Sequence, residues 1–160
     1  MKLHIALLLI FMSAPAALSQ APAVCPWFTT GSAKMVLGGD VTMIAHASGN
    51  WEGSCKFEHP SGTIIQTIEI QVSKADSHAC PAGSPSLKAL GNEAVRCSRT
   101  NAQGVQFGTI AGRVRDAYFV VTMTNVQEAA SKPSSNSAPS DPFASSPLER
   151  VSEQVAGNLF

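Results

Sequence analysis

The amino-acid sequence predicts an α+β domain: an antiparallel β-sheet of about five to six strands, with a short N-terminal helix and a C-terminal amphipathic helix packed on it. Three observations support this class. Apolar and polar residues alternate in several segments in the middle of the chain, and turn-forming residues separate these segments. Near the end of the chain, apolar residues follow at helical spacing.

The first expected element is a short helix of about two turns. Thr29 or Thr30 can cap its N-terminus, because a hydroxyl accepts from the free backbone N–H groups of the first turn. Its apolar face, at i, i+3 and i+4 spacing, consists of Ala33, Val36 and Leu37. The glycines at 38 and 39 end the helix. A helix this short needs support from the rest of the fold.

Three strands are expected in the first half of the chain. Residues 41–47 alternate between apolar and polar, a second strand begins at Cys55, and residues 63–72 show the clearest alternation. In that third strand one face carries Ile68, Ile70 and Val72. The turn signal at residues 59–62 predicts that the second and third strands form an antiparallel hairpin.

The second half predicts a loop, a short strand and another hairpin. Residues 73–86 are polar and rich in small residues, so we expect a loop there, followed by a helical turn over residues 86–90. Residues 93–99 predict a strand, and residues 103–113 and 116–125 predict a hairpin. Both faces of the last arm are fairly apolar, so that strand should be central in the sheet, with another element covering one side.

The C-terminal helix is the expected covering element. Residues 127–146 are rich in Ser, Ala and Pro, which predicts a flexible linker. The linker joins a core of residues 20–126 to a helix over residues 147–160, and this helix completes the same domain. Ser146 and Glu149 fit a capping box, with proline at the first helical position. The apolar stripe of the helix consists of Leu148, Val151, Val155 and Leu159.

Residues 1–19 have the three-part pattern of a secretory signal peptide. Lys2 gives a positive start, residues 5–12 are apolar, and small residues follow. The apolar run is about half of the ~20 residues that span a bilayer, so no integral membrane segment is expected after cleavage. We place the cut after Ser19, with Ala16 or Ala21 as alternatives, and expect a secreted or periplasmic protein.

The four cysteines, Cys25, Cys55, Cys80 and Cys97, all follow the signal peptide. An even number of cysteines in an exported chain predicts two disulfides. A four-thiolate zinc site is the alternative, but zinc ligands usually come in close pairs and these cysteines are widely spaced. A lipid anchor at Cys25 is a further alternative, although this cysteine lies too far behind the apolar run to favour it.

The charge balance argues against two classes of partner. The whole chain has 11 basic and 11 acidic residues and a formal net charge of 0, and removal of Lys2 with the signal peptide leaves about −1. There is no basic surplus to attract a nucleic acid or an anionic membrane. We expect a monomer whose partner is a protein or a small ligand.

The sequence shows no catalytic pattern. It lacks a G-x-S-x-G elbow, an H-E-x-x-H pair and a phosphate-binding loop. The mature histidines, His46, His59 and His78, fall on separate expected elements. The candidate acid–base carboxylates are Glu52, Glu58 and Glu69, and their spacing does not fix any two of them at the separation that acid–base catalysis needs. We therefore assign no catalytic, cofactor-binding or metal-binding residue, no cofactor and no enzyme activity.

Two further groups of residues have a structural and a functional interpretation. The first group consists of the aromatic residues Trp27, Trp51, Phe57 and Phe107. We expect these side chains to pack in the core, with one partly exposed tryptophan near a turn; the alternative is that they line a binding groove. The second group consists of the charged residues of the last hairpin, Arg113, Arg115 and Asp116. We expect a salt bridge within this turn; the alternative is that these residues contact a partner.

Taken in order, several short motifs have a common resemblance. Cys25-Pro-Trp-Phe-Thr-Thr with Leu37-Gly38 resembles the C-x-L-L-T … L-G opening of a family of small exported actinobacterial lipoproteins of unknown function, and Cys55-Lys-Phe57 resembles the C-x-W strand of that family. Leu90-Gly-Asn-Glu-Ala94 is similar to its G-L-G-D-E-A turn. The late strand and the terminal helix are matched by residues 115–121 and 148–159.

The resemblance implies a sheet flanked by helices, similar to the folds of Mog1 and of the photosystem oxygen-evolving P subunit. It also implies a disulfide between Cys25 and Cys55, which leaves Cys80 to pair with Cys97. The sequence departs from the family by lacking a convincing lipobox and by having a second cysteine pair. The family has no known activity to transfer.

These observations together predict an exported, disulfide-stabilised, non-catalytic domain that binds a protein or a small ligand in the envelope or outside the cell. The alternative is a secreted hydrolase in which His46 or His59 acts with a nearby carboxylate.

Overall fold

The computed structural model describes residues 24–62, 64–88, 90–124 and 146–160. These residues form one six-stranded antiparallel sheet and two helices, which confirms the α+β class. Along the chain the elements are α1 (Thr30–Leu37), β1 (Thr42–Ala47), β2 (Gly53–Ser61), β3 (Ile64–Ser73), β4 (Glu93–Thr100), β5 (Gln106–Val114), β6 (Ala117–Thr124) and α2 (Pro147–Gly157). The predicted signal peptide and almost all of the predicted linker lie outside the described residues.

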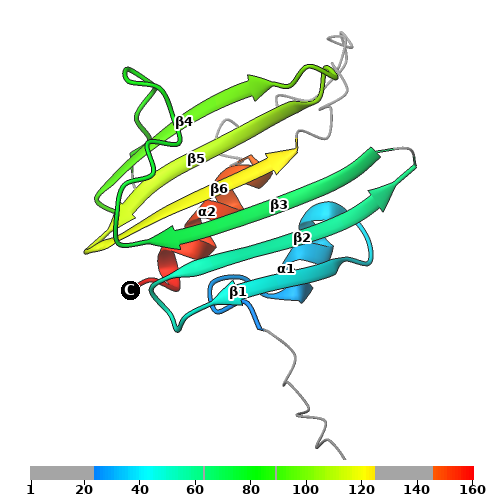
Figure 1. Ribbon diagram of the computed structural model, residues 1–160, viewed down its shortest axis with the longest axis horizontal. Coiled ribbons are helices and arrows are strands. Elements are labelled where there is room, and N and C mark those ends of the chain that lie inside the picture. Colours follow the sequence, from blue (N-terminus) through cyan, green and yellow to red (C-terminus); the bar gives the residue numbers. More distant parts are fainter. Residues whose placement is uncertain (1–23, 63, 89, 125–145) are drawn as a thin grey trace, which may run out of the picture.

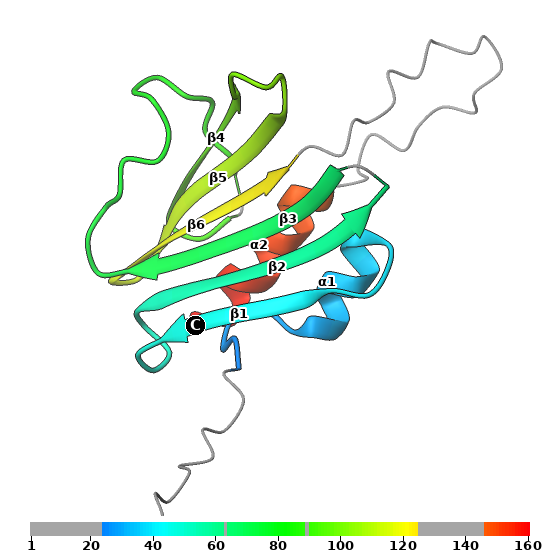
Figure 2. The same ribbon diagram turned by 45° about the vertical axis from the view of Figure 1, so that its right-hand side comes forward.

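The strands follow the spatial order β1-β2-β3-β6-β5-β4, and both helices lie on one side of this sheet (Figures 1 and 2). Helix α2 contacts β5 and β6, whereas α1 contacts β2 and β3. The described residues therefore form two layers, and neither of their two helices lies on the other face of the sheet. We call that second side the helix-free face.

The core lies between the sheet and the helices. Residues Ile70, Val121 and Ile110 stand side by side on β3, β6 and β5, and each is at most 1% exposed. Because successive side chains on a strand point to opposite faces, this row fixes which residues face the helices. Strand β6 is central, as predicted, with Phe119 and Val121 buried on the helix side.

Local capping explains where α1 begins and ends. The Thr29 side chain accepts from the backbone N–H of Ser32 at 3.0 Å, which confirms one of the two predicted caps. Gly38 follows at φ 81°, a left-handed conformation that favours glycine, and its N–H donates to the carbonyl of Lys34.

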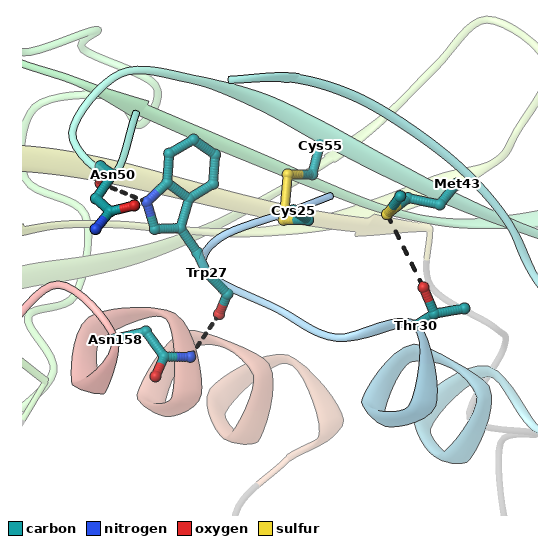
Figure 3. The surroundings of a disulfide bond; sticks show 7 residues. All are labelled: Cys25, Trp27, Thr30, Met43, Asn50, Cys55 and Asn158. Atoms are coloured by element: carbon teal, nitrogen blue, oxygen red, sulfur yellow. Dashed lines mark hydrogen bonds between the residues drawn. A yellow bond between two sulfur atoms is a disulfide. The ribbon is translucent and has the colours of Figure 1, made fainter. Parts of the chain in front are cut away.

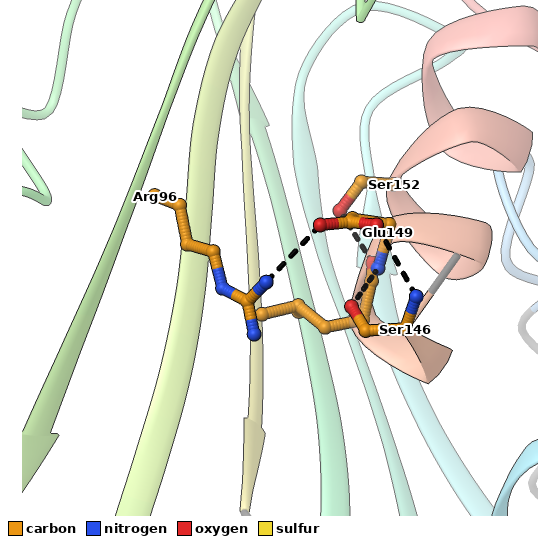
Figure 4. A network of polar contacts seen from close by, with 5 residues as sticks. Arg96, Ser146, Glu149 and Ser152 are labelled. Carbon is orange, nitrogen blue, oxygen red and sulfur yellow. Dashed lines mark hydrogen bonds and ion pairs between the residues drawn. The ribbon is translucent and has the colours of Figure 1, made fainter. Parts of the chain in front are cut away.

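The predicted capping box of α2 is present and is connected to the sheet (Figure 4). The Ser146 hydroxyl accepts from the N–H of Glu149, while the Glu149 carboxylate accepts from the N–H of Ser146. The second oxygen of Glu149 lies 3.0 Å from the guanidinium of Arg96 on β4. The start of α2 is thereby held on the sheet by a charge-assisted contact as well as by its apolar stripe.

Replacement of Ser146 by alanine is expected to lower the free energy of unfolding by about 1 kcal/mol, because the change leaves an N–H of the first turn without its acceptor. Thermal unfolding of the oxidised mature protein measures this loss. Ser98→Ala, an exposed change on β4, is the control and should leave the melting temperature unchanged. Equal effects of the two changes would contradict the role given to the capping box.

Both disulfides join the cysteines as the resemblance implies: Cys25 pairs with Cys55, and Cys80 pairs with Cys97. The first disulfide is buried among the core residues and ties the segment before α1 to β2. The second ties the long β3–β4 loop to β4. The described chain has no free cysteine.

Trp27 lies beside the first disulfide and joins three parts of the fold (Figure 3). Its indole N–H donates to the carbonyl of Asn50 in the β1–β2 turn at 2.7 Å. Its own carbonyl accepts from the side-chain amide of Asn158, just after α2, at 2.9 Å. The segment before α1 is therefore fixed to the sheet and to the last helix together.

One predicted element is wrong. The described residues of the expected helical turn over 86–90 are not helical: Ser86 forms an isolated bridge with Val95, and a turn and a bend follow. The N–H of Leu87 donates to the carbonyl of Ala94, and the carbonyl of Pro85 accepts from Arg96. The physical reason is that β4 is an edge strand, whose free backbone groups take partners from the neighbouring loop.

Gly112 allows β5 and β6 to pack closely. A Cβ atom at this position would lie 2.7 Å from Cζ of Phe119 and 3.0 Å from the carbonyl oxygen of Glu93. We expect Gly112→Ala to destabilise the domain by about 1–3 kcal/mol, because the buried ring must move. Chemical denaturation measures this. Gly157→Ala, where a Cβ meets nothing within 4 Å, is the matched control, and an equal loss there would contradict the argument.

Candidate functional site

The helix-free face carries a band of mainly polar side chains across the sheet. Neighbouring strands place these residues side by side, and the band consists of Lys56, Glu69, Thr122, Thr109 and Cys97. The hydroxyls of Thr109 and Thr122 lie 3.2 Å apart. Cys97 brings the second disulfide to this face, so the β3–β4 loop is attached on the side that lacks helices.

A hollow of about 160 Å³ lies between this loop and the strands. We call it the face hollow, and the side chains that define it are Asp76, Val95, Ala111, Arg113, Tyr118 and Val120. Its floor is apolar, because three of these residues are small or branched aliphatic residues on β4, β5 and β6. Its rim carries an arginine, a tyrosine and an aspartate. An apolar floor with a few polar groups at the rim is the usual composition of a small binding site.

Arg113 is the central charged residue of the face hollow. One of its terminal nitrogens lies 3.5 Å from the carboxylate of Glu93, and its guanidinium is 6.0 Å from the ring centre of Tyr118. Its Nε is buried and has no hydrogen-bond partner among the described residues. The side chain as a whole is 38% exposed, so its terminal nitrogens, rather than the enclosed Nε, can donate to an acceptor that a ligand brings.

Asp76 is held in place by its own loop. Its carboxylate accepts from the backbone N–H of His78 at 2.9 Å, and the other oxygen lies 3.3 Å from Nδ1 of the same histidine. His78 has a left-handed backbone, at φ 47°, and an exposed ring. The loop thus presents Asp76 to the rim of the hollow through a local turn.

The three histidines lie on separate elements, as the sequence predicts. His46 is exposed on the edge strand β1, and His78 is in the β3–β4 loop. His59 on β2 bonds through Nδ1 to the carbonyl of Asp40 at 2.7 Å, so Nδ1 must carry the proton and donate. Among the described residues, no three His, Cys, Asp or Glu side chains lie close enough together to bind a metal ion.

The surroundings of His59 are those of a packed residue. A Cβ at Gly39 would collide with its imidazole ring, so the glycine is what allows the two segments to approach. The carboxylate of Asp40 is bound by Lys34 at 2.7 Å, and this hydrogen bond holds the pKa of Asp40 below its usual value. The carboxylate next to His59 is therefore engaged elsewhere.

Two of the three acidic residues, Glu58 and Glu69, form a solvated cluster with Lys56. Nζ of Lys56 lies 2.8 Å from the carboxylate of Glu58 and 3.5 Å from that of Glu69, which raises the pKa of the lysine, chiefly through its hydrogen bond to Glu58. Glu52 is exposed in the β1–β2 turn. Glu58 and Glu69 thus share a lysine between them on the sheet surface.

The aromatic residues follow the core-packing interpretation. Trp27 and Phe57 are fully buried, whereas Trp51 is 44% exposed beside a turn. Phe107 is half-buried, with the guanidinium of Arg99 5.3 Å from its ring centre. The four side chains do not form a single groove.

The last hairpin does not have the salt bridge that was expected within its turn. Among the described residues, Arg113 pairs with Glu93 on β4, and Arg115 lies over the ring of Phe160. The sequence interpretation also missed Tyr118 and Asp76 as site residues. The alternation along β6 was the available signal for Tyr118, since it places this residue on the same face as Val120.

None of the helices in the described part of the chain has the length and apolar character needed to cross a bilayer. Comparison with family models, with curated proteins and with solved structures finds no match to the chain. The relation to the exported lipoprotein family therefore stays a prediction.

Proposed function

We propose that this protein is an exported, non-catalytic binding domain that receives a protein side chain or a small ligand in the face hollow. The observation that carries the proposal is the position of Arg113, whose side chain is 38% exposed at the rim of an apolar floor. A carboxylate or carbonyl group would accept from its terminal nitrogens, and the carbon skeleton attached to that group would cover the floor.

The disulfides support the proposed location, which is the envelope or the extracellular space. Two disulfides hold the described domain together, and such bonds persist in oxidising compartments. Expression of the full chain in a secreting host tests the location. We expect an oxidised protein outside the cytoplasm that begins at Gln20. A cytoplasmic, reduced protein that keeps residues 1–19 would contradict export.

Binding at the face hollow is tested by titration of ¹⁵N-labelled oxidised protein with acetate and with benzoate. Amide signals of β5 and β6 around Ala111 and Val120 should shift, more strongly with benzoate because its ring covers the apolar floor. Arg113→Gln should weaken the binding about tenfold or more, since a charge-assisted hydrogen bond is lost.

Arg99→Gln is the matched control, because Arg99 is an exposed arginine near the far end of β4. It should leave the binding unchanged. Shifts that are absent, or that are lost equally in the Arg99 and Arg113 variants, would overturn the assignment of the face hollow.

A further inference from the structure

A second and larger hollow lies at one end of the sheet, outside the face hollow. Its volume is about 560 Å³, and we call it the end hollow. It is lined by Trp51, Lys74, Arg115, Asp116 and Ala117. These residues come from the β1–β2 turn, from the chain just after β3, and from the β5–β6 turn with the first residue of β6. All of these segments lie at the end of the sheet where the C-terminus is marked in Figure 1.

The end hollow combines a flat apolar surface with positive charge. Trp51 is 44% exposed, in contrast to the fully buried Trp27, so its indole ring is available to a ligand. Two cationic residues, Lys74 and Arg115, line the hollow together with a single acidic residue, Asp116. The site therefore favours a ligand that is negatively charged and that also presents a flat, weakly polar face.

Two contacts hold Arg115 beside the end hollow. Arg115 has φ 53°, in the left-handed region that hairpin turns use, and its N–H donates to Oδ1 of Asn92 at 2.9 Å. Its guanidinium lies 5.6 Å from the ring centre of Phe160. The turn and the C-terminal ring therefore fix the backbone and the charge of Arg115 at this end of the sheet.

We propose that the end hollow binds an acidic saccharide of the uronic-acid type. The C–H face of a sugar ring packs on the indole of Trp51, the carboxylate binds Lys74 and Arg115, and hydroxyl groups donate to Asp116. A neutral sugar would not use the two cations, and an inorganic anion would not use the indole. This inference goes beyond the proposed function, because it concerns another site and another class of ligand.

Calorimetric titration of the oxidised protein with trigalacturonate tests the proposal, with neutral galactotriose and inorganic phosphate as comparison ligands. We expect saturable binding of trigalacturonate that weakens as the salt concentration rises. Tryptophan fluorescence should report the same event, because Trp51 is exposed and Trp27 is buried. Equal binding of galactotriose or of phosphate, or no binding of trigalacturonate, would overturn the proposal.

Three variants locate the site. Arg115→Asn removes the charge but tolerates the left-handed backbone, so it should keep the melting temperature while weakening trigalacturonate binding about tenfold or more. Lys74→Gln and Trp51→Ala should weaken it similarly. Arg99→Gln and Arg113→Gln are the controls and should not change the affinity. Retained binding in the Arg115 and Trp51 variants would contradict the site. A loss in the Arg113 variant alone would place trigalacturonate in the face hollow and would overturn the end-hollow assignment, whereas a failure of the face-hollow proposal leaves the Arg115 and Trp51 results unchanged.

Discussion

Replacement of Trp27 by alanine is expected to lower the free energy of unfolding by about 3–5 kcal/mol, because a large, fully buried side chain leaves a cavity. The loss extends beyond the ring. The carbonyl of Asn50 loses the donor that now lies 2.7 Å away, and the chain segment that accepts from Asn158 loses its anchor in the core. Urea denaturation of the oxidised mature protein measures the effect.

Two further variants separate the causes. Trp27→Phe keeps most of the apolar contact but removes the indole N–H, so it should cost about 0.5–1.5 kcal/mol, the net contribution of one hydrogen bond to a carbonyl in an exposed turn. Trp51→Ala, at the exposed tryptophan, should change the free energy of unfolding by about 0.5 kcal/mol or less. Equal losses in Trp27→Ala and Trp51→Ala would contradict the account of the core.

Removal of the Cys25–Cys55 disulfide is expected to have an effect of similar size. The chain-entropy model assigns about 3–4 kcal/mol to the closure of a 30-residue span and a slightly smaller value to the 17-residue span of Cys80–Cys97. The first disulfide is also buried at both ends, at 5% and 2% exposure, so its loss disturbs the packing of the core as well.

The comparison uses two double variants, Cys25→Ala with Cys55→Ala and Cys80→Ala with Cys97→Ala. The first should lose more stability than the second. In the second variant, amide hydrogen exchange should become faster in the β3–β4 loop around Asp76, while the protection of the core strands is largely retained. A larger loss of stability in the second variant would contradict the view that the first disulfide is part of the core.

Local patterns explain which parts of the fold the sequence could predict. The alternation around Ile68 and Ile70, the cap at Thr29 and the capping box at Ser146 are each encoded within a few residues, and the structure has all three. The extended pairing of Ser86 with Val95 could not be predicted in the same way. It exists because the free backbone groups of the edge strand β4 form hydrogen bonds with the neighbouring loop. Such a contact between distant residues produces no pattern within a short stretch of sequence.

The two hollows could not be predicted for a related reason. Lys74, Trp51 and Arg115 come from three different connections, and they meet only because the strand order brings one end of β1, β3 and β6 together. Likewise, Asp76 reaches the face hollow through the loop that the second disulfide attaches to β4. Sequence reasoning could place Tyr118 and Val120 on one face, but not the loop beside them.

The central claim is that the helix-free face is the binding surface, and capture from an envelope extract with matched charge variants tests it most directly. Val120→Asp places a carboxylate in the face hollow, and Met35→Asp places one on the exposed side of α1. After both variants are shown to be folded and oxidised, the account predicts a partner that the wild type and Met35→Asp retain and that Val120→Asp loses. A partner retained equally by Val120→Asp, or no retained partner or ligand at all, would contradict it.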